Sequence, residues 1–178
     1  DYLHYQDNIK INHTGGVINS DYNSVLGALI DFPVENNLEE RFYIPGLIQA
    51  ESFTNQSGLV TENTTDTGGG LNIGYTDLND YAEYPVFISQ SGIYDLNLRV
   101  AAQWQSGQIE ISLIENGTSE ILGLFNLPVT GGWQSWVTNS NEVDLIAGVY
   151  TLKIRVAQPG FNFNWMEFLY SDSNLSTN

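Results

Sequence analysis

The sequence predicts an all-β protein, a β-sandwich of the jelly-roll type. Short runs in which apolar and polar residues alternate recur along the chain from about residue 43. Such alternation is typical of half-buried strands. Turn signals that contain Gly separate these runs. No segment shows the sustained apolar stripe of an amphipathic helix.

The individual strands can be read from this alternation in chain order. In residues 94–100, 109–113 and 150–156 every second side chain is apolar, and residues 161–165 alternate aromatic residues with Asn. Turns are expected at Ser91-Gly92, Asn116-Gly117, Gly131-Gly132, Ala147-Gly148 and Pro159-Gly160. The aromatic residues within alternating runs are expected in the core: Tyr84, Tyr94, Trp136, Trp165 and Phe168.

A change of pattern near Arg41–Pro45 predicts a domain boundary. Residues 1–42 contain short apolar pieces without a sustained period, and we expect an appendage, a linker or the tail of a preceding domain. Residues 43–172 form the predicted sandwich, and residues 173–178 a C-terminal linker. We expect the chain to be a processed or excerpted piece of a longer protein.

The composition restricts the class of partner. The 178 residues include 21 Asp and Glu but 5 Lys and Arg, for a net charge of -16. Such a chain is poorly suited to phosphate backbones or anionic membrane surfaces, so we expect no nucleic-acid or membrane partner. No apolar run approaches the roughly 18 residues of a membrane span. Hydrophobic residues make up 42%, enough for a packed core, and we expect a monomer.

The inventory of reactive side chains argues against an enzyme. No Cys occurs, and both histidines precede residue 43, so the predicted sandwich has no material for His-based triads or thiolate chemistry. Asp77, Asp80 and Glu83 lie close together in the sequence and could serve as the carboxylate pair of a small glycoside hydrolase. The alternative is that they line a solvated strand edge. A structural or adhesion sandwich without sugar binding is a further alternative.

Two aromatic residues beside glycines suggest a binding role. Trp133 follows Gly131-Gly132, and Tyr75 follows Gly74, in segments rich in Gly, Thr, Asn and Asp. An aromatic ring on a loop offers an apolar platform to the flat C–H face of a pyranose sugar. Nearby polar groups can then select the pattern of hydroxyls.

Six sequence segments, in order and at plausible spacing, together resemble carbohydrate-binding module family 6. They are Ile48-Gln-Ala-Glu51, Thr64-Thr-Asp-Thr-Gly-Gly-Gly70, Asn72-Ile-Gly-Tyr75, Asp80-Tyr81 with Tyr84, Thr130-Gly-Gly-Trp-Gln-Ser-Trp136 and Phe161-Asn-Phe-Asn-Trp165. The resemblance covers about residues 43–170. It implies a non-catalytic, secreted module with a jelly-roll sandwich of the galactose-binding-like type, covalently linked to a polysaccharide-degrading catalytic domain such as a glycoside hydrolase.

The resemblance also implies roles for individual residues. Tyr75 and Trp133 match the positions that hold a sugar ring in loops at one end of the sandwich. Asn162 matches an Asn that hydrogen-bonds the sugar. Glu62 takes the place of a Glu that contacts terminal hydroxyls in some members, with Thr65 nearby.

A second cleft and a structural calcium ion are further implications of the resemblance. Tyr81 stands where some members use a Trp in a second cleft on the concave sheet face. The calcium ligands would be Gln49, Glu51, Asn164 and the backbone carbonyl of Leu71. On a strand Gln49 and Glu51 would point to one face, and hard cations prefer oxygen ligands. A merely polar outer face is the alternative.

The ligand is expected to be a neutral polysaccharide or oligosaccharide, because the chain is strongly acidic. Agarose, β-1,3-glucan and xylan are candidates, and we favour agarose or a β-1,3-glucan. Glu62 at the mouth of the site would close one side of the cleft. We therefore expect recognition of a chain end, the non-reducing one.

Overall fold

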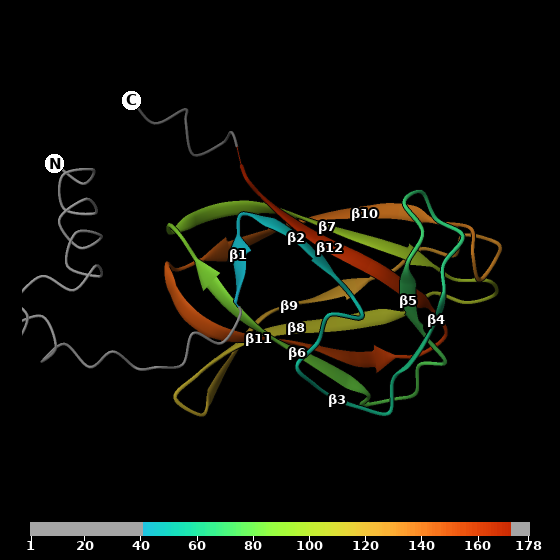
Figure 1. Ribbon diagram of the computed structural model, residues 1–178, viewed down its shortest axis with the longest axis horizontal. Helices are drawn as coiled ribbons and strands as arrows, with labels where there is room; N and C mark the ends of the chain where they lie inside the picture. The colour runs from blue at the N-terminus through green and yellow to red at the C-terminus, as the bar shows by residue number, and fades with distance from the viewer. Residues whose placement is uncertain (1–40, 172–178) are drawn as a thin grey trace, which may run out of the picture. The chain divides into compact units, whose positions relative to one another are not determined.

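The computed structural model describes residues 41–171, and all regular elements in this range are β-strands (Figure 1). The strands are β1 (Phe42–Ile44), β2 (Gly46–Gln49), β3 (Asn55–Ser57), β4 (Val60–Asn63), β5 (Leu71–Gly74), β6 (Tyr81–Ile88), β7 (Gly92–Ala101), β8 (Gln108–Glu115), β9 (Thr118–Asn126), β10 (Val137–Leu145), β11 (Gly148–Gln158) and β12 (Asn162–Tyr170). The predicted appendage (residues 1–42), apart from Arg41 and Phe42, and the predicted linker (173–178) lie outside the described residues.

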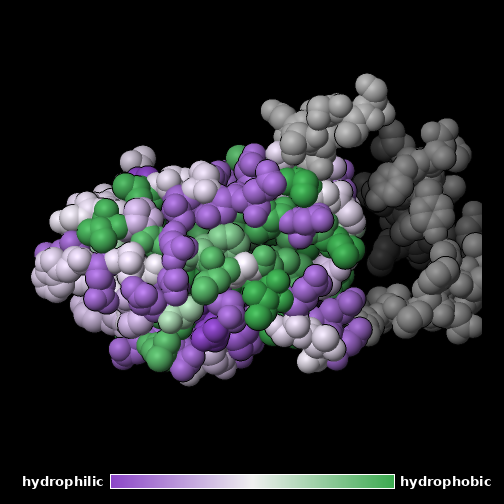
Figure 2. Space-filling model, turned by 180° about the vertical axis from the view of Figure 1, so that it is seen from behind, coloured by the Kyte–Doolittle hydropathy of each residue, from purple (hydrophilic) through white to green (hydrophobic). Residues whose placement is uncertain are grey.

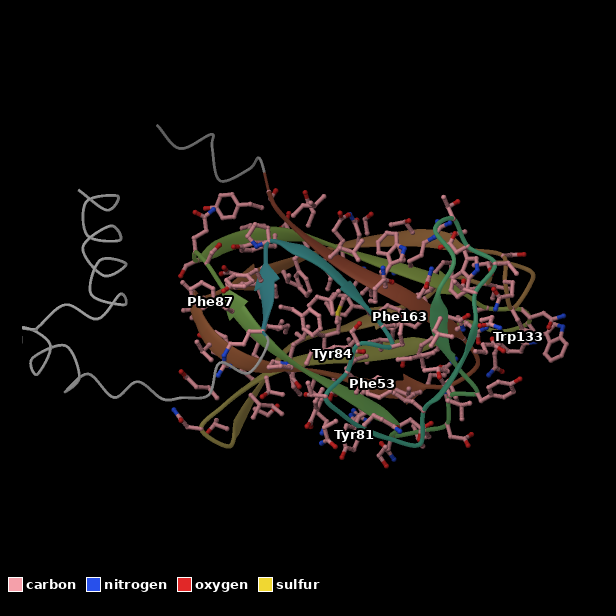
Figure 3. The ribbon with its side chains drawn as sticks, viewed as in Figure 1. Phe53, Tyr81, Tyr84, Phe87, Trp133 and Phe163 are labelled. Carbon is pink, nitrogen blue, oxygen red and sulfur yellow. The ribbon has the colours of Figure 1, made fainter. Side chains whose placement is uncertain are left out.

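The strands form two sheets of six. The first has the order β1-β6-β11-β8-β9, with β3 also paired to β6. The second has the order β10-β7-β12-β5-β4, with β2 also paired to β12. The predicted all-β sandwich is confirmed, and its core lies between the sheets, where Figure 3 places Tyr84 and Phe163.

Alternation predicted the buried faces of the long strands correctly. Tyr94, Leu96, Leu98 and Val100 of β7 are all fully buried. Ile109, Ile111 and Leu113 of β8 are buried too, as are Leu152, Ile154 and Val156 of β11. Tyr84 and Phe168 also belong to the core, whereas the core prediction was wrong for Trp136 and Trp165, which are half-buried.

Strand β12 departs from simple alternation at its beginning. Asn162, Phe163 and Asn164 are all buried, and the pairing with β7 shifts register between Phe163 and Trp165. Phe163 belongs to the core. The two Asn side chains instead contact segments that cover the other face, since Asn162 bonds to the 127–136 loop and Asn164 to the 64–70 loop. The start of β12 is therefore covered on both faces, which allows it to present polar groups without exposing them fully.

The surface is mixed in character. In the view from behind, hydrophobic residues gather near the middle of the face, between hydrophilic ones (Figure 2). At the loop end, which lies on the left of that view, residues of intermediate hydropathy predominate. Within residues 41–171 there is no helix of the length and apolarity needed to cross a membrane.

A buried hydrogen bond fixes the turn that follows β2. The Tyr84 hydroxyl donates to the Ala50 carbonyl at 2.6 Å, and both residues are fully buried. Burial raises the pKa of Tyr84 far above its ordinary value, with the charge of Glu51 as a second cause, so the hydroxyl keeps its proton as a donor.

We predict that Tyr84→Phe lowers the free energy of unfolding by about 1–2 kcal/mol, because the Ala50 carbonyl is left buried without a partner. Tyr94→Phe is the matched control, since the Tyr94 hydroxyl donates to the carbonyl of Gln90, an exposed residue that water can reach. Urea unfolding of both variants measures the difference. Equal losses in the two would contradict the role given to Tyr84.

Candidate functional site

A pocket of about 310 Å³ opens among the loops at one end of the sandwich. Its lining residues are Glu62, Tyr75, Thr76, Trp133, Gly160, Phe161 and Asn162. Four residues predicted for the principal site, Glu62, Tyr75, Trp133 and Asn162, thus line one pocket although they come from four separate segments. Figure 3 shows Trp133 at this end of the molecule.

The aromatic walls of the pocket are accessible. Tyr75 is 71% exposed and Trp133 is 37% exposed, so both offer apolar area that the protein itself does not bury. Tyr75 follows the last residue of β5 and has a φ of 53°, in the left-handed region that is uncommon for residues other than glycine. Such conformations are costly and are concentrated at functional sites.

Asn162 ties two walls of the pocket together. Its Nδ2 donates to Glu62 Oε1 at 2.7 Å and to the carbonyl of Trp133 at 2.8 Å. Both N–H bonds of the carboxamide are thereby used, so toward a ligand Asn162 can only accept. Gly74 permits this arrangement, because a Cβ there would lie 3.0 Å from Asn162 Oδ1 and 3.2 Å from Glu62 Oε1.

Glu62 is held by a set of amide donors. Besides Asn162, the side chains of Asn72 and Gln134 each donate to Glu62 Oε1 at 3.3 Å. Three donors on one oxygen leave Oε2 as the oxygen best able to accept from a ligand hydroxyl. The pocket therefore presents two acceptors, Glu62 Oε2 and Asn162 Oδ1, beside two aromatic rings.

Gln134 is a site residue that sequence reasoning missed. Its Nε2 donates to Asn72 Oδ1 as well as to Glu62. Its Oε1 accepts from the Thr65 amide at 2.8 Å, the Thr65 hydroxyl at 3.2 Å and Trp136 Nε1 at 3.2 Å. Thr65 is not among the residues that line the pocket, and it bonds to Gln134 instead. Its predicted contact with sugar stays a prediction.

Tyr81, predicted for a second cleft, lies on β6 away from Trp133 (Figure 3). Lys153 Nζ sits 3.8 Å from the centroid of the Tyr81 ring and is also ion-paired to Glu83 at 2.9 Å. A sugar that stacked on that face of the ring would have to displace the ammonium group and lose the cation–π contact. The second cleft stays a prediction.

The four predicted calcium ligands come from three strand ends. Strand β2 ends at Gln49, which is exposed, and Glu51 lies in the following turn. The expectation that Gln49 and Glu51 share a strand face was therefore wrong. Leu71 is exposed at the start of β5, and Asn164 is buried in β12. The Ala50 amide donates to the Asn164 carbonyl at 2.9 Å, which brings β12 next to the turn that carries Glu51.

Two oxygen atoms of this group are buried without a hydrogen-bond partner, Glu51 Oε2 and Asn164 Oδ1. A buried polar atom without a partner costs about 1–3 kcal/mol, so such atoms call for an explanation. Among the described residues no three His, Cys, Asp or Glu side chains gather in a way that could hold a metal ion. The four predicted ligands supply one carboxylate, that of Glu51, and neutral oxygens, a donor set that calcium accepts.

Asp66 is a second residue that sequence reasoning missed. Its carboxylate accepts from Arg99 Nη2 at 2.7 Å, from Arg99 Nε at 2.8 Å and from Asn164 Nδ2 at 2.9 Å. The hydrogen bond from Arg99 is the main reason why the pKa of Asp66 is lowered from 3.8 to about 2, against the opposing effect of burial. The carboxylate thus anchors the 64–70 loop to β7 and β12.

Two of the three carboxylates considered for catalysis, those of Asp80 and Glu83, have structural partners. Asp80 Oδ2 accepts from the Asp77 amide at 2.7 Å, which closes a short turn. Glu83 accepts from Lys153 at 2.9 Å and from Asn55 at 2.8 Å. Burial alone would raise the pKa of Glu83, but these donors lower it overall, so it is not suited to act as a general acid.

The fold and the pocket define a β-sandwich module with an aromatic-lined pocket among the loops at one end. Comparison with known proteins agrees. The model of the family described as "Carbohydrate binding module (family 6)" matches residues 49–169. The chain belongs to carbohydrate-binding module family 6.

Two solved family 6 modules and one longer protein are similar to this chain in sequence. The family 6 module of Cellvibrio mixtus lichenase 5A, solved in complex with cellotriose, is 40% identical with a TM-score of 0.67, covering 71% of this chain and 98% of that one. A β-1,3-glucan-binding family 6 module from Bacillus halodurans is 33% identical with a TM-score of 0.66, covering 73% and 99%. The clotting factor G alpha subunit of Tachypleus tridentatus is 36% identical over 133 residues, 73% of this chain but 20% of that subunit.

The family decides between the classes of function left open by the sequence. The solved structures that match over nearly their whole length are carbohydrate-binding modules, which confirms that this module is not an enzyme. The family therefore argues against the alternative of a small glycoside hydrolase that uses Asp77, Asp80 and Glu83. The module is a carbohydrate-binding module.

We predict that the stabilising effect of Asp66 disappears in acid. A carboxyl whose pKa is lowered by folding stabilises the folded state above its ordinary pKa, and this contribution is lost as the pH falls through the folded value. For Asp66 the window runs from about pH 4 down to about pH 2, and the contribution is about 2 kcal/mol.

The variant Asp66→Asn isolates this effect. At pH 6 we expect it to be less stable than the unmodified protein, because Arg99 loses its charged partner. The difference in free energy of unfolding should shrink as the pH is lowered to about 2. Denaturant titrations at several pH values, with chelator present throughout, provide the measurement. A difference that does not vary with pH would show that the ion pair is not its source.

Proposed function

We propose that this module binds the chain end of a neutral polysaccharide in the pocket at the loop end. The observation that carries the proposal is that two exposed aromatic side chains, Tyr75 and Trp133, line one pocket with the acceptors Glu62 and Asn162. A pyranose ring has apolar C–H faces and hydroxyls at its rim. Its faces can pack on the aromatic rings while hydroxyls donate to the two acceptors.

The two acceptors also explain why a chain end is favoured. Asn162 is almost fully buried at the base of the pocket, and Glu62 is fixed beside it by three amide donors. A terminal sugar has free hydroxyls that can reach such groups, whereas an internal sugar uses some of these oxygens in its linkages. We assign the non-reducing end to the pocket. Comparing molar affinity for short oligomers with that for long polymers checks this assignment, because end recognition depends on the number of ends.

We favour a β-1,3-glucan as the polymer. The solved module from Bacillus halodurans that is 33% identical over nearly its whole length is a β-1,3-glucan-binding module. Agarose is the alternative, and affinity electrophoresis on laminarin, lichenan, agarose and xylan separates the two. The interaction per site is expected to be weak, with a Kd between about 10 μM and 1 mM, since few groups form the site.

The role of such binding is tethering. A module that holds an attached catalytic domain on its substrate raises the effective concentration of that substrate without adding chemistry. The chain spans about a fifth of the clotting factor G alpha subunit that it matches, so modules of this kind also occur in much longer proteins. Because an attached enzyme has to be outside the cell to meet an extracellular polysaccharide, we propose that the module is part of a secreted protein.

We also propose that calcium binds at the turn after β2. The support is the pair of buried oxygens without partners, Glu51 Oε2 and Asn164 Oδ1, which lie on adjacent segments. A Cβ on Gly70 would lie 3.7 Å from Glu51 Oε1, so the backbone just before Leu71 also approaches this carboxylate. Calcium would satisfy these oxygens, with Gln49 and the Leu71 carbonyl as further predicted ligands.

We predict that Trp133→Ala abolishes detectable binding of the preferred polysaccharide, because one aromatic wall of the pocket is lost. Isothermal titration calorimetry measures the affinity, and circular dichroism checks that the fold is intact. Tyr43→Ala is the matched control, since Tyr43 is 69% exposed on β1 but packs against Phe87 instead of the pocket. Unchanged affinity in Trp133→Ala would contradict the assignment of the pocket as the binding site. Residual binding that Tyr81→Ala removes would instead support the second cleft.

We predict that calcium stabilises the module and that Glu51→Gln removes this effect. A ligand at about a hundred times its Kd stabilises the folded state by about 2.7 kcal/mol. The unmodified protein should therefore unfold at a higher temperature with calcium than with chelator. The variant should unfold at the same temperature in both, because the only charged ligand is neutralised. No effect of calcium on the unmodified protein would overturn the proposed metal site.

A further inference from the structure

The loop between β7 and β8 carries a Trp that has no role in the pocket as described. Trp104 is 76% exposed, which makes it the most exposed large hydrophobic side chain among the described residues. An indole so placed gains almost nothing from burial within its own protein. Trp and Tyr are typical of binding surfaces, where they add large contact area.

The position of Trp104 beside the pocket is fixed by its neighbours on both sides. The Ala102 amide donates to Thr130 Oγ1 at 2.9 Å, and the Thr130 amide donates back to the Ala102 carbonyl at 2.8 Å. This pair ties the start of the loop to the segment that carries Trp133. On the other side, Gln105 donates to the Pro159 carbonyl at 3.1 Å, next to the pocket residue Gly160.

The two indoles are in direct contact. The ring centroids of Trp104 and Trp133 are 5.6 Å apart, and the ring planes meet at 77°. Trp133 nevertheless lines the pocket, so Trp104 leaves the part of that ring that faces the pocket open. Trp104 itself is not among the residues that line the pocket, and it lies outside the pocket against one of its walls.

From this placement we propose that Trp104 is the platform for the next sugar along the chain, the one that follows the sugar held in the pocket. This inference rests on the proposed function, because it assumes that the pocket takes a terminal sugar. A chain that leaves the pocket beside Trp133 would next meet Trp104, because the two indoles are in contact and Trp104 is exposed. Stacking on it adds apolar contact for the second sugar without any further hydrogen bond.

The angle between the rings makes Trp104 a determinant of specificity. Two sugars that stack on rings meeting at 77° must be turned strongly with respect to each other. A curved chain, such as a β-1,3-glucan, changes the orientation of its sugar rings along the chain and can meet this requirement. A flat ribbon, such as a β-1,4-glucan, keeps its sugar faces close to parallel planes. Trp104 therefore favours curved chains over flat ones.

The experiment compares ligands of different length on Trp104→Ala. Glucose, laminarihexaose and cellohexaose are titrated against the unmodified protein, Trp104→Ala and the control Tyr43→Ala, by calorimetry or by NMR shifts for the weaker ligands. We expect Trp104→Ala to bind laminarihexaose about tenfold more weakly, a loss of about 1.4 kcal/mol, while its affinity for glucose is unchanged. The preference for laminarihexaose over cellohexaose should shrink by the same factor. Trp104→Phe should retain part of the affinity.

Other results overturn the inference in distinguishable ways. An equal loss for glucose and laminarihexaose would show that Trp104 only supports Trp133. No loss for either would show that the ring takes no part in binding. Either result leaves the proposed function intact, as long as Trp133→Ala abolishes binding. Failure of the unmodified protein to bind any of the three ligands, or the polysaccharide panel, would instead remove the proposed function and this inference together.

Discussion

The pocket depends on one side chain, the carboxamide of Asn162. Its two N–H bonds go to Glu62 on β4 and to the backbone of Trp133, at 2.7 and 2.8 Å. One residue at the start of the central strand β12 therefore positions both the acceptor Glu62 and the loop that carries Trp133. Because both donors are spent within the protein, the pocket offers a ligand acceptors and apolar surface. A neutral, hydroxyl-rich ligand fits that description, since it supplies donors and C–H faces together.

The charges of the module reinforce this selectivity. The three basic residues after Ile44 are each held in an ion pair, Arg99 with Asp66, Lys153 with Glu83 and Arg155 with Glu110. Each pair joins segments that are distant in the sequence, and each is partly screened from water, so the cations stabilise the sandwich and are not presented to a ligand. The remaining acidic surplus repels polyanions. Recognition therefore has to rest on rings, amides and carboxylates.

The sequence could predict those features that have a local cause. Burial of one face dictates alternation, so β7, β8 and most of β11 were predicted with the correct residues inside. The conspicuous position of Tyr75 and Trp133 beside glycines also pointed to the pocket. Gln134 and Asp66 could not be found in this way, because their partners Thr65 and Arg99 are 69 and 33 residues away. Alternation also failed at Asn162 and Asn164, where loops cover the second face of β12.

The 64–70 loop connects the proposed sugar pocket with the proposed calcium position. At Thr65 it holds Gln134, which positions Glu62 in the pocket. At the next residue, Asp66 binds the Nδ2 of Asn164, whose Oδ1 is one of the two buried oxygens without partners. An Asp in place of Asn164 would set a second carboxylate against Asp66 and remove this donor. The neutral amide therefore fits both neighbours: its nitrogen donates to Asp66 of the loop, and its oxygen is left for the proposed cation. Two adjacent residues of one loop thus order the proposed metal position and the pocket acceptor Glu62.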